Sequence, residues 1–178
     1  ASRILDLGCA HGYLTTWYAL QDRRREVTGV DFSKESVVQA RRMARRLGVR
    51  NVKFTCLDLA RDVLRATYDV LVDTQTLQDL EDLDRVFAGL ARLLRPGGFL
   101  LSVPALATAR DAKRFLRSMS RGGFALRSCD FIFFSDCSIP SAYPVITGSL
   151  GEGTIEPDFA RLYQEILDAL TRPCYPNL

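Results

Sequence analysis

A glycine-rich segment near the start of the chain has the spacing of a nucleotide-binding loop. It reads Ile4-Leu5-Asp6-Leu7-Gly8-Cys9-Ala10-His11-Gly12, an apolar run followed directly by small residues. Glycines let a backbone approach a ligand closely, and the start of a following helix offers unpaired N–H groups. The register is Asp6-x-Gly8-x-Ala10-x-Gly12, and Tyr13 stands where the dinucleotide pattern G-x-G-x-x-G requires its last glycine. The spacing therefore indicates a nucleotide-type ligand other than a dinucleotide.

The elements that must position this loop alternate between two kinds of apolar pattern. Short apolar runs occur at 3–7, 26–30, 51–56, 68–73, 98–103, 124–134 and 143–149. Helical periodicity occurs between most of them, at 12–20, 34–47, 81–94 and 110–120. This alternation predicts an α/β sheet with right-handed crossovers and both faces covered. The run 124–134 is apolar on both alternating sets, which favours a strand buried on both sides over an edge strand facing water.

Turn and capping residues agree with these boundaries. Ser33 is placed to cap the helix at 34–47, and Gly48 follows as its stop. Arg95-Pro96-Gly97-Gly98 ends the 81–94 helix and turns the chain into the next strand. The short gap between 124–134 and 143–149, with Pro140 and Pro144 in or beside it, leaves no room for a helical crossover. The last two strands should therefore be antiparallel.

The chain beyond the last strand has a different pattern. Residues 157–171 form an amphipathic helical sequence whose apolar side carries Phe159, Leu162, Ile166, Leu167 and Leu170. The sequence accordingly predicts one domain at 1–150 and a helical extension at 151–178.

Five motifs in sequence order strongly resemble those of class I S-adenosylmethionine-dependent methyltransferases, whose first motif is D/E-x-G-x-G-x-G. After the glycine loop come Val30-Asp31-Phe32-Ser33, Cys56-Leu57-Asp58-Leu59, Tyr68-Asp69-Val70-Leu71-Val72-Asp73 and Leu93-Leu94-Arg95-Pro96-Gly97-Gly98-Phe99-Leu100. The resemblance covers roughly residues 3 to 149. It implies a three-layer sandwich around a mostly parallel seven-stranded sheet of order 3-2-1-4-5-7-6. The last strand would be antiparallel, and helices would lie on both faces.

The resemblance also implies roles for the residues at the methionine end of the cofactor. Gly8, Cys9, Ala10 and Gly12 would lie along the methionine part and contribute mainly backbone groups. Asp6 would reach the methionine ammonium group, directly or through water.

At the adenosine end the resemblance assigns five residues. Asp31 would accept hydrogen bonds from both ribose hydroxyls, a geometry that suits a carboxylate. Phe32 would cover the adenine, Asp58 would accept from its exocyclic amine, and Leu57 and Leu59 would form the walls. For Asp6, Asp31 and Asp58 alike, the alternative interpretation is that the carboxylate caps a turn.

Ala10 and His11 are the two residues of the glycine loop whose side chains bear on cofactor binding or catalysis. Ala10 replaces the middle glycine of the family motif, and because alanine tolerates ordinary φ values we expect weaker cofactor binding at most. His11 is the sole histidine of the chain. Its place in the loop allows a catalytic role, but the position before the last glycine varies widely in this family. We therefore favour a position facing the cofactor or solvent.

The acceptor side is less well defined. In an open α/β sheet it lies beyond the carboxyl ends of the strands, near 73–79, 104–108, 135–141 and whatever precedes Ala1. Similar small-molecule enzymes carry histidine after the fourth strand, where this chain has Leu77-Gln78-Asp79-Leu80. The catalytic candidates are Asp73 and Asp79, with Gln75 and Gln78 beside them. Asp73 is also a candidate cofactor ligand, whereas Asp79 has the alternative of capping a helix near Glu81. The polar loop 135–138 is either pocket lining or an ordinary turn.

Composition narrows the partners and the location. The net charge is only +3, and no apolar run approaches the roughly 20 residues that cross a bilayer. The basic residues Arg41, Arg42, Arg45 and Arg46 share a helix face, which we interpret as solvated rather than RNA-binding. The five scattered cysteines predict reduced thiols, no metal site and a cytoplasmic protein.

These features together predict S-adenosylmethionine-dependent methyl transfer to an oxygen, nitrogen or carbon of a small molecule, with S-adenosylhomocysteine as product. The helices that precede the first strand in such enzymes are not in this sequence, so a further segment or a partner chain would complete the lid. Three alternatives stay open: an RNA or protein methyltransferase using the Arg41–Arg46 face, a non-catalytic cofactor-binding module, and, more distantly, a nicotinamide dehydrogenase.

Overall fold

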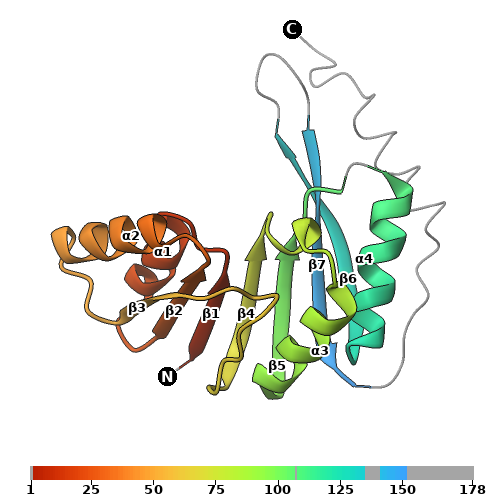
Figure 1. Ribbon diagram of the computed structural model, residues 1–178, viewed down its shortest axis with the longest axis horizontal. Helices are drawn as coiled ribbons and strands as arrows, with labels where there is room; N and C mark the ends of the chain where they lie inside the picture. The colour runs from red at the N-terminus through yellow and green to blue at the C-terminus, as the bar shows by residue number, and fades with distance from the viewer. Residues whose placement is uncertain (1, 107, 135–140, 152–178) are drawn as a thin grey trace, which may run out of the picture.

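A single seven-stranded sheet forms the centre of the fold. The computed structural model describes residues 2–106, 108–134 and 141–151 (Figure 1). The strands are β1 (Arg3–Leu7), β2 (Glu26–Asp31), β3 (Val52–Cys56), β4 (Tyr68–Thr74), β5 (Leu94–Val103), β6 (Phe124–Phe134) and β7 (Ser141–Leu150). Their order is β3-β2-β1-β4-β5-β7-β6, in which β1 to β5 pair in parallel and β7 is antiparallel to both its neighbours. The predicted sheet order and the antiparallel last pair are confirmed.

The helices divide between the two faces because the chain moves outward from β1 in both directions. Four α-helices and one 3-10 turn are described: α1 (Tyr13–Gln21), α2 (Lys34–Arg46), η1 (Leu77–Asp79), α3 (Leu83–Leu93) and α4 (Ala109–Arg121). Right-handed crossovers toward β3 put α1 and α2 on one face, and crossovers toward β6 put α3 and α4 on the other. In Figure 1, α1 and α2 accordingly gather at the β1–β3 half of the sheet and α3 and α4 at the β5–β7 half.

Alternate residues of each central strand enter different cores. Leu5 and Leu7 of β1 are fully buried in the larger core under α3 and α4, whereas Ile4 joins a smaller cluster under α1. In the larger core, the ring of Phe87 meets those of Phe115 and Phe124 edge to face, at centroid distances of 5.2 and 5.9 Å. Each such buried side chain contributes about 1.5–3 kcal/mol to stability. The two cores together fix the strands whose ends carry the site.

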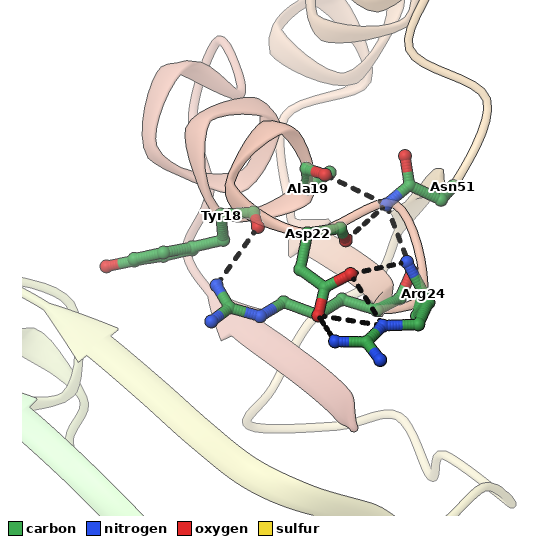
Figure 2. Close-up of polar contacts among 6 residues, drawn as sticks. Tyr18, Ala19, Asp22, Arg24 and Asn51 are labelled. Atoms are coloured by element: carbon green, nitrogen blue, oxygen red, sulfur yellow. Dashed lines mark hydrogen bonds and ion pairs between the residues drawn. The ribbon is translucent and has the colours of Figure 1, made fainter. Parts of the chain in front are cut away.

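The C-terminal end of α1 is held by the side chain of Asn51, the residue directly before β3. Asn51 donates from Nδ2 to the carbonyl oxygens of Ala19 (2.9 Å), Asp22 (3.3 Å) and Arg25 (3.0 Å), as Figure 2 shows for the labelled residues. Arg25 also donates to the carbonyl of Tyr18 at 3.3 Å. These contacts satisfy carbonyls that a helix end leaves unpaired, so they fix where α1 stops.

The capping residues behave partly as expected. The Ser33 hydroxyl accepts from the Ser36 N–H at 3.1 Å, and Gly48 follows α2 with φ +67°, so both predicted ends are confirmed. At α3, however, the cap is Asp82, whose carboxylate accepts from the Arg85 N–H at 3.1 Å. The helix begins later than residue 81, and Asp79 lies in η1 instead of capping it.

The prediction for the apolar run 124–134 was wrong in one respect. β6 is an edge strand that pairs only with β7 among the described strands. Phe124 is buried in the core beside α4 and Ala125 is also buried, but Arg127, Ser128 and Asp130 are exposed. The sequence pattern of this stretch therefore does not reveal that its strand lies at the sheet edge.

Two predicted features lie outside the described residues: the helix at 157–171 and the loop at 135–138. Of the five cysteines, Cys9, Cys56 and Cys129 are described, and Cys9 and Cys56 are free thiols. None of the helices in the described parts of the chain is long and apolar enough to cross a membrane.

Candidate functional site

The glycine loop leaves β1 and turns sharply into α1. The Cys9 N–H donates to the carbonyl of Val30 at 2.9 Å, and the Gly12 N–H donates to the carbonyl of Cys9 at 2.8 Å. The Gly12 carbonyl then accepts the first hydrogen bond of α1, from Thr16. The loop is therefore pinned to the end of β2 while it wraps around the helix start.

Both outer glycines of the loop are required by their surroundings. Gly8 has φ +68°, and a Cβ there would lie 2.1 Å from the Thr76 hydroxyl oxygen. Gly12 has φ +78°, and its Cβ would lie 2.6 and 2.7 Å from side-chain atoms of Phe54 and Ala40. Such distances are far inside van der Waals contact, so the backbone here passes as close to its neighbours as glycine allows.

The expectation that Ala10 would adopt an ordinary φ was wrong. Ala10 has φ +44°, in the left-handed region that disfavours residues with a Cβ. Its N–H donates to the Asp31 carboxylate at 2.8 Å, which holds it there. The loop keeps the glycine conformation at this position despite the substitution, at a cost of about 1–2 kcal/mol.

Asp31 ties the loop to the end of β2. One carboxylate oxygen accepts from the Ala10 N–H and the other from the Ser33 N–H at 2.9 Å, and the side chain is almost wholly buried. A carboxylate has about four lone-pair sites, so each oxygen keeps capacity for one further donor. Asp31 is thus both a turn-capping residue and an available acceptor at the edge of the site.

Asp6 is the second-to-last residue of β1, just before the glycine loop. Its carboxylate accepts from the Thr15 hydroxyl at 2.5 Å and is 3% exposed. Burial raises the pKa of Asp6 to about 6, with smaller upward contributions from Asp73 and Asp31, while the Thr15 hydrogen bond opposes the shift. A buried carboxylate beside two others is stabilised by a cation, so this position suits a ligand ammonium group.

A pocket of about 230 Å³ opens directly over these residues. It is lined by Asp6, Gly8, Cys9, Ala10, His11, Tyr13, Leu14 and Thr74. Ligand pockets usually measure about 300–1,000 Å³, so this one would hold only part of a nucleoside-sized molecule. Four predicted cofactor residues, Asp6, Gly8, Cys9 and Ala10, therefore line one cavity, whereas Gly12 is not part of its lining.

Cys9 contributes backbone to this pocket and packs its side chain inward. The thiol lies in the cluster formed by Val37, Ala40, Ala44 and Phe54 under α2. Burial raises the pKa of Cys9 to about 12, so the thiol stays protonated at neutral pH. It is unsuited to act as a nucleophile.

The predicted adenosine residues lie farther along the carboxyl edge. Phe32 follows β2 with its side chain 80% exposed, an unusual position for a phenylalanine and one that suits a stacking ligand. Asp58 accepts from the Ala60 N–H at 2.9 Å and faces Arg61 at 3.6 Å, so it caps its own turn. Leu57 and Leu59 line a separate cleft of about 440 Å³ against α3.

The catalytic candidates differ in their access to the site. Asp73 is completely buried: one oxygen accepts from the N–H groups of Thr76 and Leu77, both at 3.0 Å, and the other accepts from the Ser102 hydroxyl. Burial also raises the pKa of Asp73. Asp79 is exposed and accepts from the Gln78 amide at 3.1 Å. Asp73 thus faces the turn, and Asp79 faces solvent.

Several residues of the site were not identified from the sequence. Tyr13, Leu14 and Thr74 line the pocket, Thr15 binds Asp6, and Thr76 restricts Gly8. The first three are adjacent to motifs, at the first turn of α1 and the end of β4, so their positions offered a signal. Gln75, one of the residues named beside Asp73, has φ +58°. Within the described ranges, no group of three or more metal-binding side chains is present.

Comparisons with known proteins agree with this geometry. Residues 1–130 match a family model described as a methyltransferase domain. A malonyl-[acyl-carrier protein] O-methyltransferase from Bacillus anthracis is 37% identical over 99 residues, which are 56% of this chain and 36% of that protein. The chain therefore spans only about a third of that relative's length.

Solved structures of low sequence identity share the fold. The N-methyltransferase NodS from Bradyrhizobium japonicum, in complex with S-adenosyl-L-homocysteine, has a TM-score of 0.69 at 18% identity, covering 85% of this chain and 79% of its own. The [4+2]-cyclase SpnF has a TM-score of 0.66 at 24% identity, covering 74% and 54%. One sheet thus supports different reactions, and the site has to carry the functional argument.

Proposed function

Since the chain belongs to the class I S-adenosylmethionine-dependent methyltransferase family, we propose that it binds S-adenosylmethionine and methylates a small-molecule acceptor. S-adenosylhomocysteine would be the second product. The cofactor would lie along the carboxyl edge of β1, β2 and β3, over the glycine loop. When bound, it supplies a methyl group activated by a sulfonium centre.

The observation that carries this proposal is the arrangement of Asp31. Its carboxylate holds the Ala10 and Ser33 N–H groups and so joins the glycine loop to the turn that carries the exposed Phe32. The free lone pairs suit two vicinal hydroxyls, and the exposed ring beside them suits a base. A ribose with a stacked adenine fits this pair of features.

Different residues along the carboxyl edge of the sheet would contact different parts of the cofactor. Asp6 would pair with the ligand ammonium, which compensates the desolvation of its carboxylate. Backbone groups at Gly8 and Ala10 would contact the amino-acid part, which the pocket of about 230 Å³ can hold. Asp58, Leu57 and Leu59 stay predictions for the adenine side.

For the chemical step, we assign Asp73 to positioning. Both its oxygens accept hydrogen bonds inside the protein, and these hold the turn that contains Gln75 and η1 against the pocket. Methyl transfer needs the acceptor in line with the sulfonium, and a stable turn beside the pocket supplies that orientation. Asp79 stays the accessible candidate for a base.

Substitution of Asp31 tests the cofactor assignment. Asp31→Ala should weaken S-adenosylmethionine binding by about 1.5–3 kcal/mol, the contribution of a charge-assisted hydrogen bond. Asp31→Asn keeps the shape and one acceptor and should lose less. Isothermal titration calorimetry gives both values. Asp22→Asn is the matched control, because Asp22 binds Arg24 at 2.9 Å, outside the pocket lining. Unchanged affinity in Asp31→Ala would remove the ribose assignment.

The nature of the acceptor follows less directly. The Bacillus anthracis relative is named as an O-methyltransferase, which supports an oxygen nucleophile among the three possibilities. Turnover assays with oxygen, nitrogen and carbon acceptors of similar size would distinguish them. Cofactor binding without turnover across the whole panel would instead support the non-catalytic module.

The RNA alternative is disfavoured by where the arginines lie. Arg41 donates to the carbonyl of Phe54 at 3.1 and 2.6 Å, so its guanidinium is committed to β3. Arg45 and Arg46 occupy the last turn of α2, and this helix begins at the carboxyl edge with Ser33. The basic face therefore lies toward the opposite end of the sheet from the pocket.

The extent of the domain and its closure also belong to this proposal. We infer a methyltransferase domain over 1–150 and an extension over 151–178, and we expect a further segment or partner chain to cover the pocket. Closure excludes water and orients the acceptor, so it should raise turnover strongly. A cytoplasmic location stays a prediction from the cysteines.

A further inference from the structure

The connection between β3 and β4 forms a cleft against α3. Residues 57–67 form no helix between these two strands, and in Figure 1 the connection crosses in front of the sheet toward α3. The cleft that they enclose with α3 measures about 440 Å³, compared with about 230 Å³ for the pocket over the glycine loop. Small-molecule sites usually measure about 300–1,000 Å³, so the volume of this cleft suits a small molecule.

The two walls of the cleft are largely apolar. Leu57, Leu59 and Leu64 come from the connection, and all three are partly buried against the larger core. Val86 of α3 lines the opposite wall and is buried. Val63 also lines the cleft and is 80% exposed, so the apolar surface continues to the mouth. An apolar ligand would therefore contact carbon atoms on both walls.

Gly89 leaves the backbone of α3 bare in the middle of one wall. Glycine is among the least favourable residues in a helix interior. A Cβ at this position would meet no described atom within 4 Å, so packing inside the described chain does not require a glycine. The absent side chain widens the cleft, and a ligand that lies against the helix backbone is one established use of glycine.

Three arginines border the cleft. Arg85 and Arg92 lie four residues before and three residues after Gly89, on the same face of α3, and Arg65 comes from the connection. All three are exposed, and none of them forms an ion pair within the described part of the chain. Asp62, the acidic residue of the described lining, accepts a backbone N–H of its own turn at 2.8 Å. The border is therefore net positive and attracts an anionic group.

We propose that the cleft between residues 57–67 and α3 binds an anionic amphiphile with a single apolar chain, of the type of a medium-chain fatty acid. The apolar chain would lie between Leu64 and the bare helix backbone at Gly89. The anionic head would pair with the guanidinium groups at the border, which match carboxylate and phosphate oxygens in a bidentate geometry. This site is additional to the cofactor pocket, and the inference does not depend on methyl transfer.

Isothermal titration calorimetry with decanoate, below its micelle concentration, tests the proposal. Decanoate should bind, and decyltrimethylammonium, with the same chain and the opposite charge, should bind about tenfold more weakly or not at all. Decyl phosphate is the second anionic probe. Binding of either anion supports the proposal, and the tighter of the two identifies the preferred head group.

Variants of the two walls test the chain and the head separately. Gly89→Leu fills the cleft and should weaken decanoate binding by about tenfold or more, while α3 is kept because leucine favours a helix. Circular dichroism checks that the fold is retained. Arg85→Gln and Arg65→Gln remove a border charge and should each weaken decanoate binding by about fivefold. Arg117→Gln is the matched control, because Arg117 is exposed on α4 and outside the lining.

The cofactor product is the competitor that separates this site from the first one, because Leu57 and Leu59 are also the predicted walls for adenine. S-adenosylhomocysteine should leave decanoate binding unchanged. Displacement of decanoate would overturn the proposal and assign the cleft to the cofactor. Equal decanoate affinity in the wild type and in a folded Gly89→Leu protein, or unchanged affinity in both arginine variants, would also overturn it. Failure of both anions to bind would do the same.

Discussion

Asp31 and Asp73 both lie near the carboxyl ends of parallel strands but have different environments. Asp31 is the last residue of β2 and Asp73 the second-to-last residue of β4, at the same edge of the sheet. Each accepts two backbone N–H hydrogen bonds: Asp31 from Ala10 and Ser33, and Asp73 from Thr76 and Leu77. Asp31 divides these between its two oxygens and keeps free capacity beside the exposed Phe32. Asp73 gives one oxygen to both N–H groups and the other to Ser102, and it is fully buried.

The strands beside each aspartate explain why the two carboxylates differ in free hydrogen-bonding capacity. Asp31 lies where the neighbouring β3 is a short outer strand, so its edge stays open. Asp73 lies between β1 and β5, and Ser102 of β5 closes over it. An acid near the end of a strand thus keeps free acceptor capacity or becomes fully hydrogen-bonded inside the protein, according to which residues the next strand places beside it.

The largest loss of stability is expected from substitution of Asp73. Asp73→Ala leaves the N–H groups of Thr76 and Leu77 and the Ser102 hydroxyl without their acceptor, and should lower the free energy of unfolding by about 3 kcal/mol. Urea denaturation measures this loss. Ser102→Ala is the control, because it removes a single hydrogen bond and should cost less.

Asp73→Asn tests whether Asp73 holds the turn by hydrogen bonds or acts as a general base. The amide keeps a carbonyl oxygen for both N–H groups and can donate to Ser102, so stability and turnover should stay near wild type. A fall in kcat of about 100-fold or more, with stability unchanged, would instead identify Asp73 as a general base.

An intermediate effect is expected from Asp6, whose burial raises its pKa from 3.8 to about 6. Since the folded chain holds this proton more tightly than the unfolded chain, the stability that it contributes is present below pH 4 and is lost as the pH rises through 6. Asp6→Asn should remove this dependence and stabilise the ligand-free protein by about 2 kcal/mol at pH 7.5.

The measurement for Asp6 is the free energy of unfolding at several values between pH 4 and 8, compared with Thr15→Val. Loss of the Thr15 hydrogen bond should raise the pKa of Asp6 further and extend the pH dependence of stability to higher pH. An Asp6→Asn protein with an unaltered slope would show that another group titrates. The same variant should bind S-adenosylmethionine more weakly, because the ammonium loses its carboxylate.

The smallest effect is expected at Ala10. Ala10→Gly relieves a left-handed φ of +44° and should stabilise the protein by about 0.5–1 kcal/mol, after allowance for the greater freedom of glycine in the unfolded chain. Thermal melting detects a change of this size. Gly8→Ala is the opposite control, since its Cβ would clash with Thr76, and it should destabilise the protein clearly.

The fold was predictable to a large extent because its signals are local and repeated. Apolar runs marked the strands, and the family motifs supplied their order in the sheet. The position of the 124–134 run could not be read in this way, because exposure at the sheet edge depends on how far α4 extends along β6. The apolar pattern of the sequence predicts that a strand forms, whereas the burial of that strand depends on the helices and strands packed against it.

The candidate site was predictable at the glycine loop and less so elsewhere. Asp6, Gly8, Cys9 and Ala10 do line one pocket, because their spacing is set by a single turn. The left-handed φ of Ala10 was missed because alanine was expected to take an ordinary φ, although the family motif has a glycine at this position. Ser102 was missed for a different reason: it lies on another strand, and only the register of β4 and β5 brings it to Asp73.

The position of Asp31 has a consequence for motion in the loop. Because one carboxylate holds both the Ala10 and the Ser33 amides, a rotation of the Asp31 side chain would release both turns at once. The two amides should therefore exchange their hydrogens with solvent as one unit, with a single opening free energy. A ligand that binds Asp31 would slow both rates together, so the loops after β1 and β2 would act as one gate.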